Sequence, residues 1–189
     1  GKIDQNILEL LKINVRLPDV FVGDINSQIA ACTVGRRRLS ELCKFYKRNF
    51  LLEVFELLLD RSESMTRKAL LKIPDGKYHY EDYLDNDGVT LDKPIKISVD
   101  AIVEQGKIRF DFDNTSEQVK GPFNCVPSGS LSAACFAVRV LTGSEIPTNG
   151  GCFRPITLEL PEGSIVNPTE PAPVNARTST IKRIAGCMV

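Results

Sequence analysis

The stretch Ile95-Lys-Ile-Ser-Val-Asp-Ala-Ile-Val-Glu-Gln-Gly-Lys-Ile-Arg-Phe-Asp-Phe112 decides the fold class of this 189-residue chain. Apolar and polar residues alternate on both sides of Gln105-Gly106, which is the period of a strand with one buried face. A two-residue connection that contains glycine suits a tight turn between antiparallel strands. We therefore expect an antiparallel hairpin that joins residues 94–104 to residues 107–112.

The sequence before this hairpin has the period of helices. From Asp24 to Tyr46, small or apolar residues recur every three or four positions, as they do in a helix that buries one stripe. Gly35 lies on that stripe, where it permits the close approach of another helix. We expect helices over residues 4–12, 24–46, 49–60 and 62–73.

Further elements flank the hairpin. We expect a strand before it, and after it a helix that buries one side, another strand and a terminal amphipathic helix, over residues 77–83, 128–141, 153–160 and 181–189. The helix over 128–141 is expected to bury Leu131, Cys135, Val138 and Leu141 and to stop at Gly143.

Helices come first and strands later, so the expected fold class is α+β. Residues 1–73 form an N-terminal helical segment, and residues 74–189 form an α+β segment with a mainly antiparallel sheet and packed helices. The terminal helix ends in an apolar stretch without a cap. We therefore expect the chain to be a fragment of a larger subunit.

Composition excludes several classes of partner. Lys plus Arg equals Asp plus Glu, at 24 each, so no net field attracts nucleic acid or an anionic membrane. No apolar run reaches the roughly 18 residues of a membrane span, and the N-terminus has no signal-peptide core. Six cysteines without a C-x-x-C pair indicate free thiols in a reducing compartment, so we expect a cytoplasmic protein.

Familiar catalytic motifs are missing from the sequence, including those of nucleotide-binding loops, zinc proteases and serine hydrolases. His79 is the single histidine, which argues against a Ser-His-Asp or Cys-His site and against a metal site in this chain. It lies between two tyrosines of an expected strand, so a structural role is favoured over a catalytic one. The catalytic residues are unknown at this point.

Two charged motifs have simple interpretations. The stretch Asp85-Asn-Asp-Gly88 is similar to a calcium-binding loop, but Tyr83 and Pro94 stand where the first aspartate and the bidentate glutamate belong. A tight turn is therefore favoured. Arg36-Arg-Arg38 could bind a phosphate or a partner's carboxylates, although a solvated helix face is favoured.

Three polar joints lie at the ends of the expected elements, at residues 120–125, 148–154 and 173–178. Each combines glycine or proline with an amide, hydroxyl or guanidinium group, as loops that contact ligands do. Turn formation alone explains such joints too. If the joints share a site, Asn124, Asn149 and Arg177 approach one concave region.

At these joints the sequence resembles the hydantoinase B family, a subunit type also found in ATP-dependent 5-oxoprolinases and in acetone and acetophenone carboxylases. Seven short motifs occur in family order along nearly the whole chain. They are Asn14-Val-Arg-Leu-Pro18, residues 23–38, Asp111-Phe-Asp-Asn-Thr-Ser116, Gly121-Pro-Phe-Asn124, residues 146–155, residues 161–168 and Pro171-Ala-Pro-Val-Asn-Ala-Arg-Thr178.

The resemblance implies a partner and cofactors. Members work beside a hydantoinase A type subunit, which uses ATP to activate an amide, a ketone or bicarbonate by phosphorylation. The B-type chain then helps with ring opening or carboxylation. The family's metal-associated, histidine-rich stretch lies upstream of the position that corresponds to Gly1. The resemblance thus implies ATP and a divalent metal for the full complex, with neither held by this chain.

These observations lead to the following hypotheses. The first is a fragment of a B-type subunit that takes part in ATP-dependent hydrolysis of cyclic amides such as hydantoins or 5-oxoproline. The alternatives are a scaffold that docks the A-type partner through residues 24–46 and a portion of a ketone carboxylase. The chain alone is expected to be inactive and to self-associate through an apolar patch on its terminal helix. The candidate substrate-binding residues are Asn124, Asn149, Gly150, Gly151, Arg154, Asn175, Arg177 and Thr178.

Overall fold

The computed structural model describes residues 3–189 and divides the chain into two compact units. The first extends to Phe55 and the second comprises Glu56–Val189. The boundary falls inside helix α3 (Arg48–Leu70), whereas the sequence analysis placed it at residue 73, where the helical segment ends. Helices precede the sheet along the chain, as the predicted α+β class requires.

The first unit is helical and begins with α1 (Gln5–Ile13) and α2 (Pro18–Tyr46). Asp4 caps α1, because its carboxylate accepts hydrogen bonds from the backbone N–H groups of Asn6 at 2.9 Å and Ile7 at 3.4 Å. Helix α2 begins six residues before the expected start at Asp24. Pro18 lies in its first turn, where the fixed φ of proline favours a helix and its missing N–H costs nothing.

The predicted buried stripe of α2 is not covered within the first unit. Ile29, Leu39 and Leu42 are 43%, 47% and 43% exposed, and α2 buries no residue. A Cβ built on Gly35 would meet no other atom within 4 Å. The helical period was predicted correctly, but the partner that the stripe and Gly35 imply is not part of this unit.

Helix α3 is one continuous helix where the sequence predicted two, over residues 49–60 and 62–73. Neither glycine nor proline occurs between Arg48 and Leu70, so nothing forces a break. The side chain of Ser62 at the predicted gap is fully buried and accepts a hydrogen bond from the Asn149 amide at 2.8 Å. A contact from a distant loop thus holds the helix through this point.

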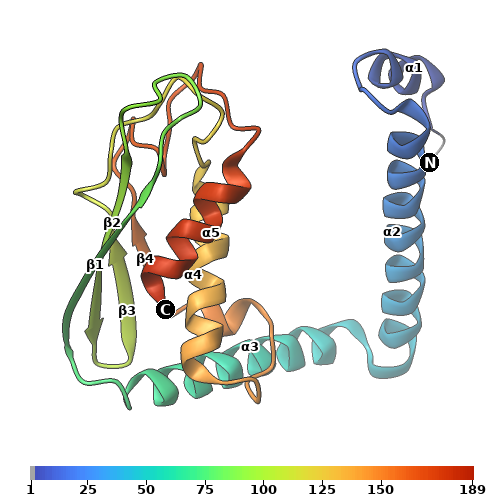
Figure 1. Cartoon of the computed structure of the whole chain (residues 1–189). Helices are drawn as coiled ribbons and strands as arrows, with labels where there is room; N and C mark the ends of the chain where they lie inside the picture. The colour runs from blue at the N-terminus through green and yellow to red at the C-terminus, as the bar shows by residue number, and fades with distance from the viewer. Residues whose placement is uncertain (1–2) are drawn as a thin grey trace. The chain divides into compact units, whose positions relative to one another are not determined.

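The second unit contains one four-stranded sheet among the residues that the structure describes (Figure 1). Its strands lie in sequence order, and are β1 (Gly76–Leu84), β2 (Ile95–Glu104), β3 (Lys107–Asp111) and β4 (Ile156–Glu159). The predicted hairpin is confirmed: Glu104 pairs with Lys107, and Gln105 and Gly106 take positive φ values of 49° and 72°, as a tight hairpin turn requires.

The last strand makes the sheet mixed rather than purely antiparallel. Strand β4 pairs in parallel with β3, while the other two pairs are antiparallel. The predicted strand over 153–160 is also shorter, because Gly150–Phe153 form a 3₁₀ helix, η1. A parallel pair needs a long crossover, and here α4 (Pro127–Thr142) lies in it.

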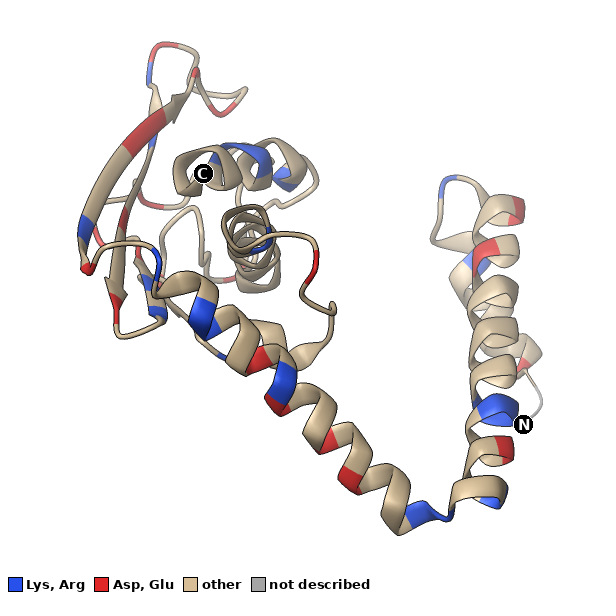
Figure 2. Ribbon diagram, turned by 90° about the horizontal axis from the view of Figure 1, so that it is seen from below, with Lys and Arg blue, Asp and Glu red and all other residues tan. Residues whose placement is uncertain are grey.

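The core lies between the sheet and two helices, α4 and α5 (Arg177–Met188), which cover the same face of the sheet (Figures 1 and 2). The buried face of α4 consists largely of small residues, among them Ala133, Ala134 and Ala137. The predicted burial of Leu131 and Leu141 is wrong, since they are 47% and 40% exposed. Close packing against α5 accounts for the difference, because it requires short side chains on this face.

Candidate functional site

The first and third of the polar joints come together around Asn124. This side chain is fully buried, and its Oδ1 accepts a hydrogen bond from the Val119 backbone N–H at 2.8 Å. Its Nδ2 donates to the carbonyl oxygens of Val119 at 2.8 Å, Gly121 at 3.2 Å and Pro173 at 3.0 Å. The Asn124 amide therefore joins two loops and has no free donor for a ligand.

The same two joints bring the starts of α4 and α5 together. The backbone N–H of Ala176 donates to Pro122 O at 2.8 Å, and the Thr180 hydroxyl donates to Phe123 O. A Cβ on Gly129 would lie 2.7 Å from Cys125 Sγ and 3.0 Å from Ile181 Cδ1, so glycine favours the close approach of α4 to α5. Two helix N-termini consequently lie beside each other.

Three candidate residues lie exposed at the start of α5, and we call Asn175, Arg177 and Thr178 the helix-start cluster. Arg177 donates from Nη1 to Val174 O at 3.2 Å and keeps its other donors toward solvent. A helix N-terminus carries partial positive charge, and a guanidinium adds a full one. The cluster therefore presents donors that suit a carboxylate, a phosphate or a polarised carbonyl oxygen.

The second joint lies against α3 instead. Asn149 donates from Nδ2 to the Ser62 hydroxyl at 2.8 Å and accepts at Oδ1 from the Gly151 N–H at 2.9 Å. Gly151 is buried, and a Cβ there would overlap the carbonyl oxygen of Leu59. At neighbouring Gly150 the nearest atom would be Leu59 Cδ2 at 3.7 Å. This joint packs a loop onto the backbone of α3.

Arg154 completes the attachment of that loop to α3. Its guanidinium pairs with Asp60 at 2.8 Å, Glu63 at 3.3 Å and Glu56 at 3.4 Å. Hydrogen bonds from Arg67 and then from Arg154 hold the pKa of Glu63 below its ordinary value. The donors of Arg154 are thus occupied by carboxylates of the same chain.

The eight candidates consequently form two groups at the two ends of α4. Asn124 comes shortly before Pro127, where α4 begins, and Asn149 comes after Thr142, where it ends. A helix of 16 residues is about 24 Å long. The structure therefore brings Asn124 and Arg177 into one region, but it does not bring Asn149 there.

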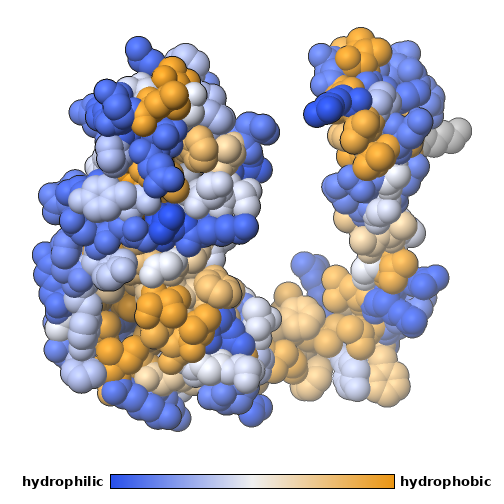
Figure 3. Space-filling view, viewed as in Figure 1, coloured by the Kyte–Doolittle hydropathy of each residue, from blue (hydrophilic) through white to orange (hydrophobic). Residues whose placement is uncertain are grey.

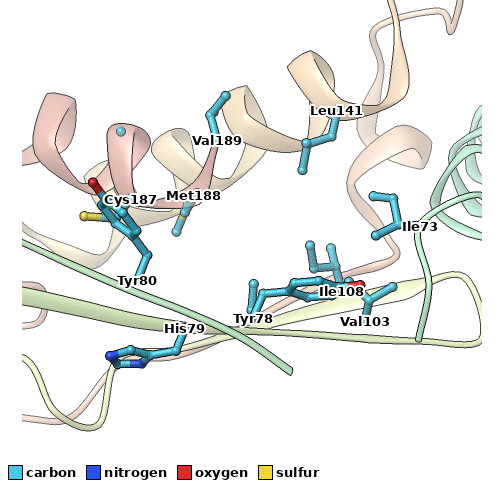
Figure 4. A pocket seen from close by; sticks show the side chains of 12 residues that line it. Ile73, Tyr78, His79, Tyr80, Val103, Ile108, Leu141, Cys187, Met188 and Val189 are labelled. Carbon is cyan, nitrogen blue, oxygen red and sulfur yellow. The ribbon is translucent and has the colours of Figure 1, made fainter. Parts of the chain in front are cut away.

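His79 has the structural surroundings that the sequence analysis favoured. Its Nδ1 lies 2.7 Å from Asp100 Oδ1, while Lys77 Nζ lies 2.8 Å from Asp100 Oδ2. A hydrogen bond from Lys77 lowers the pKa of Asp100, and the hydrogen bond with His79 lowers it further. The imidazole points away from the cavity beside its strand (Figure 4). It therefore belongs to an ionic network on the outer face of the sheet.

Asp87 stabilises the loop that follows β1, in which the sequence predicted a tight turn over 85–88. Its buried carboxylate accepts from the N–H groups of Val89 at 2.9 Å, Thr90 at 2.5 Å and Gly121 at 3.1 Å. These hydrogen bonds lower the pKa of Asp87, and the bond from Thr90 has the largest effect. The sequence did not show that Asp87 also fixes the first joint through Gly121, because the two positions are far apart in the chain.

A polar cavity of about 310 Å³ lies beside this turn, and the sequence analysis missed it. Lys93, Ser116 and Lys120 are among the residues that line it. The two lysines come from different loops, so their proximity depends on the tertiary fold and no local motif announces it.

A larger cavity of about 470 Å³ lies between the sheet and the ends of α4 and α5 (Figure 4). Its walls are mainly apolar and include Tyr78, Val103, Leu141 and Met188. Burial raises the pKa of the lining Cys187 thiol to about 11, so this thiol is protonated at neutral pH. The cavity suits apolar groups and offers no activated nucleophile.

Two further findings limit the chemistry of residues 3–189. Over this range no three His, Cys, Asp or Glu side chains lie close enough together to hold a metal ion, so the implied divalent metal finds no fitting ligand set here. Nor does any helix in the same range combine the length and the apolar character needed to cross a membrane.

Comparison with known proteins gives a consistent result. The family model described as hydantoinase B/oxoprolinase matches residues 1–189. The B component of a putative D-/L-hydantoinase from Pseudomonas sp. strain NS671 is 32% identical over 200 residues, which cover 100% of this chain and 34% of that protein.

Two solved structures share the fold. The ATP-dependent caprolactamase of Pseudomonas jessenii matches with a TM-score of 0.91 and 27% identity, over 100% of this chain and 32% of that one. A nucleotide-free acetone carboxylase matches with a TM-score of 0.80 over 94% of this chain and 25% of that one, but at 16% identity it shows the fold alone. The chain spans about a third of the length of curated relatives such as the hydantoinase component, and 12% of the length of the Saccharomyces cerevisiae 5-oxoprolinase.

Proposed function

Because the chain belongs to the hydantoinase B/oxoprolinase family, we propose that it is part of a B-type subunit that hydrolyses cyclic amides in an ATP-dependent complex. The observation that carries the proposal is the likeness to the caprolactamase structure, which extends over the whole chain with a TM-score of 0.91. Hydantoins, 5-oxoproline and caprolactam all contain the same cyclic amide bond, so they define one substrate class.

The proposed chemistry explains the need for ATP. The nitrogen of an unstrained cyclic amide is a poor leaving group, and its carbonyl carbon is a weak electrophile. Phosphorylation of the amide oxygen makes that carbon more electrophilic. Water then adds to it, and the ring C–N bond breaks as the nitrogen takes up a proton. The resulting acyl phosphate reacts with a second water, which releases phosphate and leaves the ring-opened acid. The negative oxygens of such a species require positively charged donors.

We assign this donor role to the helix-start cluster. Arg177, with the amide of Asn175 and the hydroxyl of Thr178, would bind a phosphate or carbonyl oxygen at the N-terminus of α5. Asn124 is a positioning residue, because it ties this loop to the loop before α4. The joint of Asn149, Gly150, Gly151 and Arg154 supports α3. Its contact with substrate stays a prediction. No residue of this chain is assigned the activation of water.

The proposal includes a hydantoinase A type partner that binds ATP. The described residues do not fit a divalent metal, so we assign the metal to none of the three joints. All six cysteines lie in the described part of the chain and are free thiols, which supports a reducing compartment such as the cytoplasm.

The test uses the full B-type subunit that carries this sequence, expressed with its A-type partner. ATP is supplied with 5-oxoproline, hydantoin or caprolactam, and in a separate arm with acetone and bicarbonate. We expect ADP and a ring-opened acid from at least one cyclic amide. Carboxylation of acetone without ring opening would instead establish the ketone carboxylase alternative.

The site assignment has its own test in the same complex. Arg177→Ala is expected to lower kcat/KM about a hundredfold, the cost of losing one oxyanion donor. Arg61→Ala removes an exposed arginine from α3 and is the matched control. Equal activities of the two variants would refute the role of the helix-start cluster.

A further inference from the structure

Strand β1 forms one edge of the sheet, and no strand among residues 3–189 pairs with its outer side (Figure 1). It pairs with β2 along its whole length, Gly76–Leu84, without a bulge. Its sequence contains no proline. Sheets commonly protect an edge strand by making it short, by a bulge or by a proline. Since β1 has none of these features, its edge is open to another strand.

The hydrogen bonds of β2 show which groups of β1 point to this edge. Ser98 donates from its N–H to the Thr115 hydroxyl at 3.0 Å, and its carbonyl oxygen accepts from the same hydroxyl at 2.8 Å. Both groups of Ser98 therefore point away from β1, and so the N–H and C=O of Glu81, which pairs with it, point away from β2. Every second residue of an antiparallel strand has the same direction, so Lys77 and His79 also present their backbone groups to the free edge.

The side chains of β1 form two rows beside the edge. Lys77, His79 and Glu81 lie on the outer face of the sheet, within the ionic network. Tyr78 and Tyr80 lie on the face that α5 covers, where they line the larger cavity (Figure 4). The two tyrosines are 45% and 56% exposed. One row is thus charged and the other aromatic, and both are exposed.

A second β1 is complementary to both rows in one register. In an antiparallel pair with a two-fold axis at His79, Lys77 lies opposite Glu81 of the second copy. Tyr78 lies opposite Tyr80 of the second copy. The axis repeats each pair, and cross-strand pairs of opposite charge or of aromatic rings stabilise a sheet. The backbone groups of all three outward-facing residues find partners in the same register.

Other registers of the same pair are less favourable. An axis at Tyr80 would place Tyr78 opposite Asp82 of the second copy, a carboxylate that is already paired with an arginine of its own chain. An axis at Tyr78 would place Glu81 opposite Asp75 of the second copy, and like charges in this position are destabilising. A parallel pair related by a two-fold axis would join the charged face of one sheet to the aromatic face of the other. The sequence of β1 therefore selects a single register.

The imidazoles that meet at this axis have a carboxylate beside them. Nδ1 of His79 lies 2.7 Å from Asp100 Oδ1 of the same chain, which limits the repulsion between two protonated rings. Lys77 also contacts Asp100, at 2.8 Å, but its side chain is 63% exposed. It therefore remains accessible to Glu81 of the second copy.

Helix α5 leaves room for the second copy beside this edge. Ser179, Lys182 and Gly186 line a cavity that α5 shares with Asp82 and Leu84 of β1, so this side of the helix faces the edge. Gly186 also lines the larger cavity with the two tyrosines, and a Cβ there would meet nothing within 4 Å. Figure 3 shows apolar side chains gathered around the C-terminal end of α5. At the level of the tyrosines, a second copy therefore meets a glycine of α5 rather than a bulky side chain.

We propose that β1 pairs with β1 of a second copy of this chain, antiparallel and with His79 at the two-fold axis. The two four-stranded sheets then form one continuous sheet across the dimer. The pairing is independent of the proposed function, since it uses none of the candidate site residues. A strand of the A-type subunit, or of another part of the full B-type subunit, is the competing occupant of this edge.

Charge exchange tests the register in the full B-type subunit, studied by light scattering without the A-type partner. Lys77→Glu and Glu81→Lys each place like charges opposite each other at both ends of the symmetric interface. We expect each variant to raise the dimer dissociation constant about tenfold or more. An equal mixture of the two variants should form a heterodimer with about the affinity of the native protein, because every charge then faces an opposite one.

Lys68→Glu and Glu145→Lys are the matched control, since both side chains are exposed and lie outside β1. Neither variant should change the dissociation constant, and their mixture should form no preferred heterodimer. A mixture of Lys77→Glu and Glu81→Lys that stays as weakly associated as each variant alone would overturn the proposed register.

Backbone pairing is tested at the axis itself. A proline removes one N–H, and at position 79 this group points to the free edge, so His79→Pro should leave the pairing of β1 with β2 intact and abolish the dimer. His79→Ala keeps the N–H and should still give the dimer. Circular dichroism checks that both variants are folded. Equal dimerisation of the two folded variants would show that the edge of β1 is not the interface.

Hydrogen exchange identifies the competing occupants. In the isolated subunit, the amides of Lys77, His79 and Glu81 should become protected as the protein concentration rises. Protection that does not depend on concentration would place a strand of the same subunit on this edge. Protection that appears only with the A-type subunit would place that partner there, and either result would overturn the pairing.

Discussion

Gly151 and Gly150 are neighbours in the chain but have very different surroundings. Gly151→Ala is expected to lower the free energy of unfolding by about 1–3 kcal/mol, because its Cβ would overlap Leu59 O on the rigid backbone of α3. Gly150→Ala is the matched control and should change stability by less than about 0.5 kcal/mol. Urea unfolding measures both, and equal stability of the two variants would contradict the packing described for this joint.

Asn124 and Asn175 form a second pair of positions that substitution by alanine can compare. Asn124→Ala removes the donor from the buried carbonyl oxygen of Gly121 and from two part-buried ones, so we expect a loss of about 1–3 kcal/mol in unfolding free energy. Asn175→Ala affects an exposed side chain and should leave stability unchanged while raising KM for the cyclic amide. Thermal unfolding together with kinetics separates the two roles. Loss of stability in Asn175→Ala would show that it, too, is structural.

Some contacts of individual residues could not be predicted from the sequence. The joints around Asn124 and Arg177 were identified from residue type and glycine content, and the structure does bring these two together. The internal role of Asn124 was not visible, because its partner Pro173 lies in a loop far along the chain. The contacts of Asn149 and Arg154 were not visible for the same reason: their partners on α3, Ser62 and Asp60, belong to a helix predicted as two pieces.

At the scale of elements, α5 packs its thiol into the core, and this predicts a pH dependence. The pKa of Cys187 is raised from 9.0 to about 11 by burial, so the folded chain favours the protonated thiol. The associated stabilisation is present below pH 9 and is lost as the pH rises through 9 toward 11. Unfolding free energy measured over this range should fall more steeply in the native chain than in Cys187→Ala. Parallel curves would contradict the prediction.

Elements differed in how well the sequence predicted them. The β2–β3 hairpin was predicted because its alternation and its turn are local, and β1, α1 and α5 followed in the same way. Strand β4 was expected, but its parallel pairing with β3 depends on the path of α4, which no local pattern encodes. The buried face of α4 was missed because packing against α5 selects small residues over large apolar ones.

At the scale of the whole molecule, the two units should differ in local stability. Neither α1 nor α2 buries a residue, whereas the second unit has a continuous core that includes Ile97, Phe110 and Val138. We therefore expect amide hydrogens of α2 to exchange much faster than those of β2 when the protein is dilute. Equal protection of α2 and β2 would contradict this view.

The parallel contact between β3 and β4 also has a kinetic consequence. Glu104 pairs with Lys107 across a two-residue turn, but Ile108 pairs with Ile156 only after the chain has formed the whole crossover that contains α4. Closing a long loop costs more entropy than closing a short one, so contacts of high sequence separation form late in folding. Nascent chains should therefore acquire the β1–β2–β3 meander first. Until β4 docks, the edge of β3 remains open, and a folding intermediate with that edge exposed is the species most prone to misassembly.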